Sequence, residues 1–207
     1  MDSIDCAKKR IEEIIKKSPV PEDPIHSKNT LEWLLWLKPD ADEALQIAAL
    51  GHDIERAIEE RKVRREDYKN YDDFKDAHAS NSAKILAEIM GGCSISKELA
   101  DDSFFLVCHH ERGGTRRSDI LRDADSISFF HVNLPYYFIR NGIEETKNRY
   151  LWGYRKLPDN LKRLVGEFDY QNRELASLVR ACIGESEQFD SAKTSPLYPT
   201  AKSENLS

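Results

Sequence analysis

The sequence predicts an all-α fold built as one domain. Apolar residues recur at the three- and four-residue spacing of helices in almost every segment, and no stretch shows the alternation of a half-buried strand. A chain of 207 residues is long enough to bury a sizeable core. We therefore expect a compact multi-helix bundle over residues 1–183. Residues 184–207, where Ser, Thr, Pro and Lys replace large apolar side chains, should form a disordered tail.

Apolar spacing and helix-terminating residues place the individual helices. The first should end at a proline-rich loop and the second at Pro39, because proline does not continue a helix. Asp40 and Asp42 supply acidic residues at the start of the third. Gly91-Gly92 should end the fourth, and Ser96 can cap the fifth. The predicted helices cover 2–17, 25–38, the segment through 44–56, 74–90, 96–110 and 118–131, with two or three more in 136–183; residues 59–73 form a charged connector.

Composition excludes several classes of protein. The formal net charge of −6 argues against a chain that coats nucleic acid. The start of the chain lacks an apolar segment, and the apolar run LEWLLWL is too short to span a bilayer. The cysteines are scattered, which indicates reduced thiols. We expect a cytoplasmic protein, monomeric or homodimeric, with no nucleic-acid and no membrane partner. The cysteines are Cys6, Cys93, Cys108 and Cys182.

The stretch ALQIAALGHDIER, residues 44–56, places His52 and Asp53 on otherwise apolar helix faces. A carboxylate that points into such a surface is costly unless a positive partner meets it. A metal ion is one such partner, and a buried Arg or Lys is another. This stretch alone leaves both open.

Further histidines and an aspartate stand on the inward sides of other predicted helices. Each has a simpler interpretation: a lone histidine packs in many cores, His109-His110 suits a helix C-terminus, and Asp125 could pair with Arg122. Asp123 is the alternative to Asp125, but the turn before it is less apolar. One metal site explains them all together, whereas the simpler account needs a separate reason for each. Imidazole and carboxylate suit zinc, iron or manganese. The candidate ligands are His26, His52, Asp53, His78, His109, His110 and Asp125.

The order of these residues resembles a known signature. His26-Ser27, then GHDIER, then RDADSI are similar to the pattern of the HD-domain metal-dependent phosphohydrolase superfamily over about residues 24–131. CHHERGG resembles the H-H-E segment of the HD-GYP cyclic-dinucleotide phosphodiesterases, although the D-G-x-G-Y-P continuation is absent. Length and histidine order are similar to the HD-type hydrolases of symmetrical dinucleoside tetraphosphates. The acidic pair of the guanosine tetraphosphate hydrolases is replaced by Arg56-Ala57.

The resemblance implies an enzyme with two divalent metal ions, Fe, Mn or Zn rather than Mg. Asp53 would bridge them, and a metal-activated water would attack phosphorus. The first metal would take His26, His52, Asp53 and Asp125, and the second Asp53, His78, His109 and His110. The substrate would be a phosphate ester or anhydride of a small metabolite, with a nucleotide as the leading candidate. A phosphodiesterase acting on a cyclic or linear nucleotide and a catalytically silent metal-binding regulatory module are the alternatives.

Phosphate also needs cations around it. Arg112, Arg116 and Arg117 follow the histidine pair on a glycine-rich loop, so they are candidates for substrate binding, with Lys84 as a weaker one. Arg112 and Arg56 could also assist catalysis. All of these could instead be ordinary surface cations.

Overall fold

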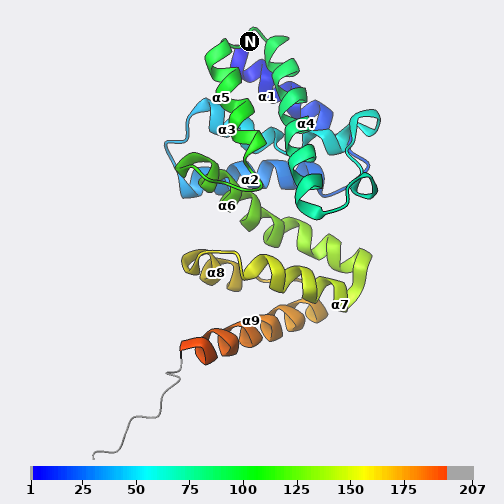
Figure 1. The fold of residues 1–207 in the computed structure, drawn as a ribbon, viewed down its shortest axis with the longest axis vertical. Coiled ribbons are helices and arrows are strands. Elements are labelled where there is room, and N and C mark those ends of the chain that lie inside the picture. Colours follow the sequence, from blue (N-terminus) through cyan, green and yellow to red (C-terminus); the bar gives the residue numbers. More distant parts are fainter. Residues whose placement is uncertain (1, 195–207) are drawn as a thin grey trace, which may run out of the picture.

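The computed structural model describes residues 2–194, with side chains to residue 186, and it confirms the all-α fold. Helices and short helical turns follow one another, and these residues contain no strand (Figure 1). The α-helices are α1 (Ser3–Ile15), α2 (Asp23–Leu37), α3 (Glu43–Gly51), α4 (Tyr71–Gly91), α5 (Lys97–Cys108), α6 (Arg116–Ser128), α7 (Leu134–Tyr154), α8 (Asp159–Gly166) and α9 (Arg173–Thr194). The short turns are η1 (Ile54–Ala57), η2 (Glu59–Arg61), η3 (Arg65–Asp67) and η4 (Phe129–Asn133).

Polar side chains begin several of these helices. Asp42 accepts a hydrogen bond from the Leu45 N–H at 3.0 Å and so caps α3. Ser96 caps α5, as predicted. The start of α6 is capped by Thr115, which forms a reciprocal capping box with Ser118. Helix α3 ends at Gly51, so His52 and Asp53 lie just beyond it and not within it.

Two hydrophobic cores divide the chain. The first packs α1, α3, α4 and α5, with the apolar side of α6, around fully buried residues such as Ile11, Leu45 and Leu86. The second lies among η4, α7, α8 and α9 around residues such as Phe130 and Tyr150. In Figure 1 the helices of the second core lie below those of the first, with α6 between them. Trp33 and Leu37 of α2 pack against both cores.

Two residues control the path from α6 into α7. Pro135 lies in the first turn of α7, where proline is well tolerated. The helical path therefore continues from α6 through η4 into α7. Gly142 then breaks α7 with a φ of 74°, a conformation that favours glycine. Figure 1 shows that the chain reverses direction within α7.

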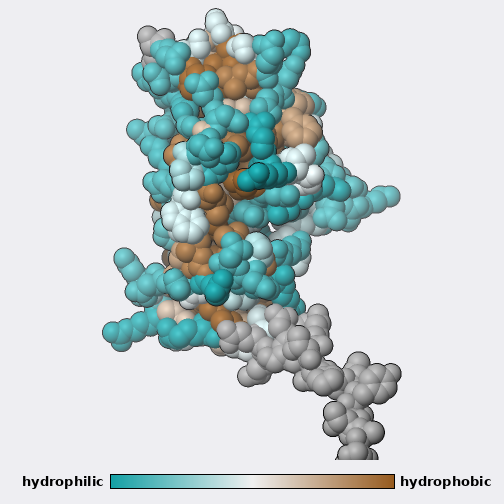
Figure 2. Space-filling view, turned by 90° about the vertical axis from the view of Figure 1, so that its left-hand side faces the viewer, coloured by the Kyte–Doolittle hydropathy of each residue, from teal (hydrophilic) through white to brown (hydrophobic). Residues whose placement is uncertain are grey.

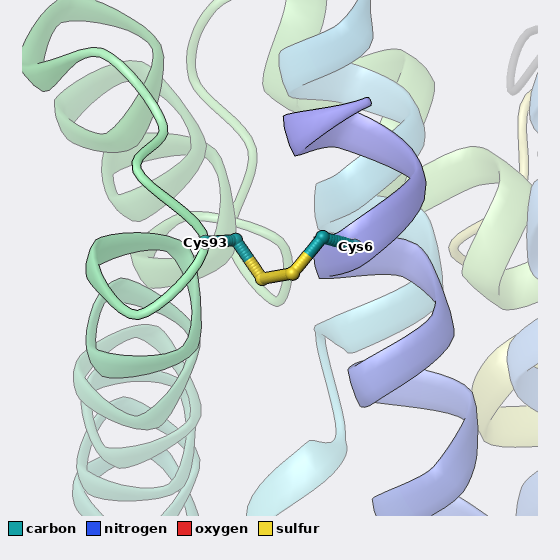
Figure 3. The surroundings of a disulfide bond; sticks show 2 residues. All are labelled: Cys6 and Cys93. Carbon is teal, nitrogen blue, oxygen red and sulfur yellow. A yellow bond between two sulfur atoms is a disulfide. The ribbon is translucent and has the colours of Figure 1, made fainter. Parts of the chain in front are cut away.

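The cysteine prediction is wrong for one pair. Cys6 of α1 and Cys93, two residues beyond α4, form a disulfide with their Cα atoms 5.8 Å apart (Figure 3). These cysteines are 87 residues apart, and only the packing of α1 beside α4 brings them together. Cys108 and Cys182 are free thiols. The scattered cysteines therefore do not support a reducing compartment as the sequence suggested.

The predicted boundary at Gly184 is also wrong, because α9 continues through this residue to Thr194. Leu175, Val179, Cys182 and Ser186 are buried at helical spacing, so the packed side of α9 extends past Gly184. The expected disorder of residues 195–207 concerns residues that lie outside the described part of the chain.

The outer surface is mostly hydrophilic on the face drawn in Figure 2, with hydrophobic residues showing between the charged ones. Within the described residues, every helix is too short or too polar to cross a bilayer.

Candidate metal centre

Six of the predicted ligands converge where α2, α4 and α6 meet the ends of α3 and α5. His26 comes from α2, His78 from α4 and Asp125 from α6. His52 and Asp53 follow α3, and His110 is the second residue after α5. They form two sets of three, and within each set the donor atoms lie within 4.8 Å of one another. The first set is His26, His52 and Asp125, and the second is Asp53, His78 and His110.

The first set is a compact triangle. His26 Nε2 lies 3.2 Å from His52 Nε2 and 3.1 Å from Asp125 Oδ1, and His52 Nε2 lies 3.3 Å from Asp125 Oδ1. Donors about 2.0–2.2 Å from one transition-metal ion are about 3–3.5 Å from each other. The observed separations therefore fit three ligands of a single ion. Asp125, and not the neighbouring Asp123, supplies the carboxylate; Asp123 contacts Arg122.

Asp53 lies between the two sets. Its Oδ2 is 3.9 Å from His26 Nε2 and 3.8 Å from His52 Nε2. Its Oδ1 is 2.8 Å from His78 Nε2 and 3.9 Å from His110 Nε2. Each carboxylate oxygen thus faces a different set, which is the arrangement that a bridging ligand needs.

All four histidines are oriented in the same way. Each places Nδ1 outward on an acceptor and Nε2 inward. His52 Nδ1 donates to the Ala49 carbonyl at 2.9 Å, and His110 Nδ1 to the Val107 carbonyl at 2.7 Å. His26 Nδ1 is 2.8 Å from Ser128 Oγ, whose proton goes to the His26 carbonyl. Such outward bonds fix the ring and leave the Nε2 lone pair for a metal.

Glu55 orients the fourth histidine. Its Oε1 accepts from His78 Nδ1 at 2.7 Å, while its Oε2 accepts from the Val63 N–H at 2.6 Å. The Glu55 side chain is almost completely buried. The carboxylate raises the basicity of the imidazole and so strengthens it as a metal ligand.

His110 gives the clearest sign of a missing partner. Its Nε2 is buried and has no hydrogen-bond partner among the described residues. Burial and the nearby positive charge of His52 lower the pKa of His110, which favours the neutral ring. Because Nδ1 carries the proton, the Nε2 lone pair points toward the Asp53 carboxylate, another acceptor. Two acceptors facing each other in a buried site are unfavourable unless a cation lies between them.

The pKa values of His52 and His78 also indicate that positive charge is favoured in this site. Burial would lower the pKa of His52, but the carboxylates of Asp53 and Asp125 outweigh it and raise that pKa to about 9. Burial likewise opposes protonation of His78, yet contacts with Asp53 and Glu55 raise its pKa to about 10. Protons thus occupy these donors when no metal does.

Arg56 neutralises part of the negative charge of Asp53. Its guanidinium contacts Asp53 Oδ2 at 2.9 Å and Asp23 Oδ1 at 3.0 Å. Burial would raise the pKa of Asp53, but His52, Arg56 and His78 hold it well below its usual range. A cationic partner of the kind that the sequence left open is therefore present as the half-buried Arg56, but it does not account for the convergence of four imidazoles.

His109 belongs to neither donor set, unlike the other six predicted ligands. Its Nδ1 donates to the Phe105 carbonyl at 2.8 Å and its ring stacks on the Phe105 ring at 4.1 Å. Helix α5 ends at Cys108, and His109 has a φ of −110°. The chain turns there, so adjacent histidines point in different directions.

The structure does not bring the predicted substrate cations to the cavity. Arg112 pairs with Asp76 on the exposed surface, and Arg117 pairs with Asp102 and Asp42. Arg116 and Lys84 are exposed. These four residues lie outside the lining of the cavity beside the ligands.

A cavity of about 430 Å³ opens beside the two sets, and His26, Asp53, His78 and Asp125 line one side of it. Aromatic and cationic residues also line it. They are Lys75, Phe129, Arg149, Trp152 and Lys156.

A family model matches residues 2–178, a range that contains all six converging side chains. The chain belongs to the DUF4202 family. The description of this family is "Domain of unknown function (DUF4202)". No curated protein and no solved structure matches the chain.

The α7 residues that line the cavity in this DUF4202 chain are what sequence reasoning missed. Arg149, Trp152 and Lys156 are spaced by three and four residues, which places them on one side of the helix and its continuation. That spacing was a usable signal. What the sequence did not show is that the reversal at Gly142 brings this segment back to the cavity.

Proposed function

We propose that this chain is an HD-type phosphohydrolase that binds two divalent metal ions and cleaves a phosphate ester or anhydride of a small metabolite, with a nucleotide as the leading substrate class. One observation carries the proposal: four buried imidazoles, each held by an outward Nδ1 bond, direct Nε2 toward Asp53 and Asp125. A structural core histidine needs no such shared orientation.

The donor set supports Fe, Mn or Zn over Mg, since four imidazole nitrogens are a poor match for a cation that prefers oxygen. When bound, two such ions would polarise a phosphoryl group and acidify water near neutral pH. Asp53 would contribute one oxygen to each. Arg56 neutralises the excess charge on the Asp53–Asp23 side and holds the bridging carboxylate in place. His26, His52 and Asp125 form the side of the site with the closest donors.

The phosphodiesterase alternative depended partly on the His109-His110 pair. Only His110 reaches the site, so that argument loses one of its two donors. A phosphohydrolase acting on a small phosphorylated compound does not depend on that pair, and the two donor sets border a cavity that can admit such a compound.

The deciding experiment combines metal content with turnover. The full chain is purified without chelator, its metals are identified by elemental analysis, and it is tested against a panel of nucleotides, phosphomonoesters and phosphodiesters. Two metals per chain with hydrolysis of a phosphomonoester or anhydride would support the proposal. Two metals with no turnover on the whole panel would favour the silent regulatory module, and absence of metal would overturn the proposal.

A further inference from the structure

The cavity has a second charged wall that the metal-centre proposal does not use. Arg149 and Trp152 come from the end of α7, Lys156 follows two residues after this helix, and Lys75 comes from α4. Lys75 lies one helical turn before His78 and forms an ion pair with Glu111, the residue after His110. Through Lys75, the wall therefore adjoins the proposed ligands His78 and His110.

The cations of this wall gather around one indole ring. Lys156 Nζ lies 3.4 Å from the Trp152 ring centroid, the Arg149 guanidinium carbon 4.7 Å and Lys75 Nζ 5.6 Å. The Arg149 guanidinium also lies 4.4 Å from the Phe129 ring centroid. Cation–π contacts of this kind hold long side chains in place without neutralising them.

The charge on this wall is not balanced locally. Glu111 neutralises Lys75, but among the described residues no carboxylate oxygen lies within 4.0 Å of Arg149 or Lys156 in an ion pair. Burial and the neighbouring Lys75 and Arg149 lower the pKa of Lys156, against the pull of Asp72 and Glu111. Two cations held on aromatic rings beside an open cavity are suited to receive an anion.

The same geometry disfavours a base-stacking role for Trp152. Three cations already lie within 6 Å of the ring, so a nucleobase would have to displace one of them to stack there. Recognition at this wall should therefore concern charge and not the identity of a base. The cavity volume of about 430 Å³ is in the lower part of the range for small-molecule sites, about 300–1,000 Å³.

We propose that Arg149 and Lys156, with Lys75, form a second phosphate subsite, so that the substrate is a small compound with two phosphate groups. The part that places the other phosphate at the metal centre rests on the proposed function. The subsite itself depends only on the α7 wall. A nucleoside diphosphate and a bisphosphorylated sugar share the required chemistry.

Binding of inorganic pyrophosphate to the metal-free full chain tests the subsite without catalysis. Calorimetric titration in chelator compares the unsubstituted chain with the double variant Arg149→Gln/Lys156→Gln. Arg163→Gln is the matched control, because it removes an exposed cation of α8 that does not line the cavity. We expect at least tenfold weaker binding for the double variant and no change for the control. Equal binding by all three chains would overturn the subsite, as would no detectable binding to the unsubstituted chain.

Kinetics with matched substrates separates the two proposals. The metal-loaded chains are assayed with fructose 6-phosphate against fructose 1,6-bisphosphate, and with AMP against ADP. The double variant should raise KM at least tenfold for the substrate with two phosphates and leave the monophosphate unchanged. An equal change in KM for both members of each pair would overturn the subsite, and the measured hydrolysis would still support the phosphohydrolase. A third outcome is that the unsubstituted chain binds pyrophosphate, the double variant does not, and no substrate is hydrolysed. This result would support the subsite and overturn the proposed activity.

Discussion

The two sides of the cavity are built in different ways. On the ligand side, the four imidazoles are buried, and each is fixed by a bond to a carbonyl, a serine or Glu55. On the α7 side, long cationic side chains lie on aromatic rings, and Lys156 is exposed. The first side can hold atoms at fixed positions, whereas the second can adapt its shape to a charged group. We infer that chemistry belongs to the first side and selection of the substrate to the second.

The largest expected effect comes from Asp53→Ala, which tests whether the ligand side is one unit. Because Asp53 faces both donor sets, its loss should remove both metals and reduce turnover by at least about 10³-fold. Elemental analysis and a phosphatase assay measure the two effects, and far-UV circular dichroism checks that the variant is folded. Full metal occupancy in this variant would contradict the bridging assignment.

A smaller effect should distinguish adjacent histidines. His110→Ala removes one donor of the second set, so we expect the affinity for the second metal to fall about 10–100-fold while the first remains bound. His109→Ala is the matched control, since its ring stacks on Phe105 outside the site. Metal titration followed by calorimetry compares the two variants. An equal loss in both would mean that His110 is not a specific ligand.

The smallest expected effect concerns the stability of the metal-free chain as a function of pH. The folded pKa values of His52 and His78 are raised to about 9 and about 10, above the ordinary value near 6.5. Their stabilising contribution is therefore complete below about pH 6.5 and is lost as the pH rises toward 10. Thermal unfolding in chelator should show a decreasing Tm over that interval. Added Mn²⁺ or Zn²⁺ should reverse the decrease, since a metal replaces the lost protons; a Tm that rises with pH in chelator would contradict the charge assignment.

The sequence predicted the fold and most of the ligand side for physical reasons. Polar residues that interrupt an apolar helix face must find partners, and this argument found His26, His78 and Asp125 inside their helices. His52 follows directly after α3 and also joins its donor set. The same argument does not separate His109 from His110, because both follow the end of α5, where helical spacing no longer applies. Only His110 joins a donor set. Asp53 also lies beyond the end of α3, yet it was found as a candidate. The reason is that it closely follows α3, a helix that is buried on nearly all sides.

The α7 side could not be predicted in the same way, because its position depends on distant parts of the chain. Whether a cation is free or paired is decided by partners far away in sequence: Asp76 for Arg112, and Asp42 for Arg117. Local sequence shows neither partner. Arg112 and Arg117 are neutralised by these partners, whereas Arg149 borders the cavity.

The disulfide between Cys6 and Cys93 closes a covalent ring that contains His26, His52, Asp53 and His78. His110 and Asp125 lie on the open segment that follows. Each donor set therefore takes two members from the ring and one from outside it, so each metal would fasten the open segment to the ring. Closing a loop of 87 residues is worth about 4–5 kcal/mol in the chain-entropy model. An oxidised chain that unfolds thus keeps most of its donors tethered together, and it begins to refold from a smaller set of conformations.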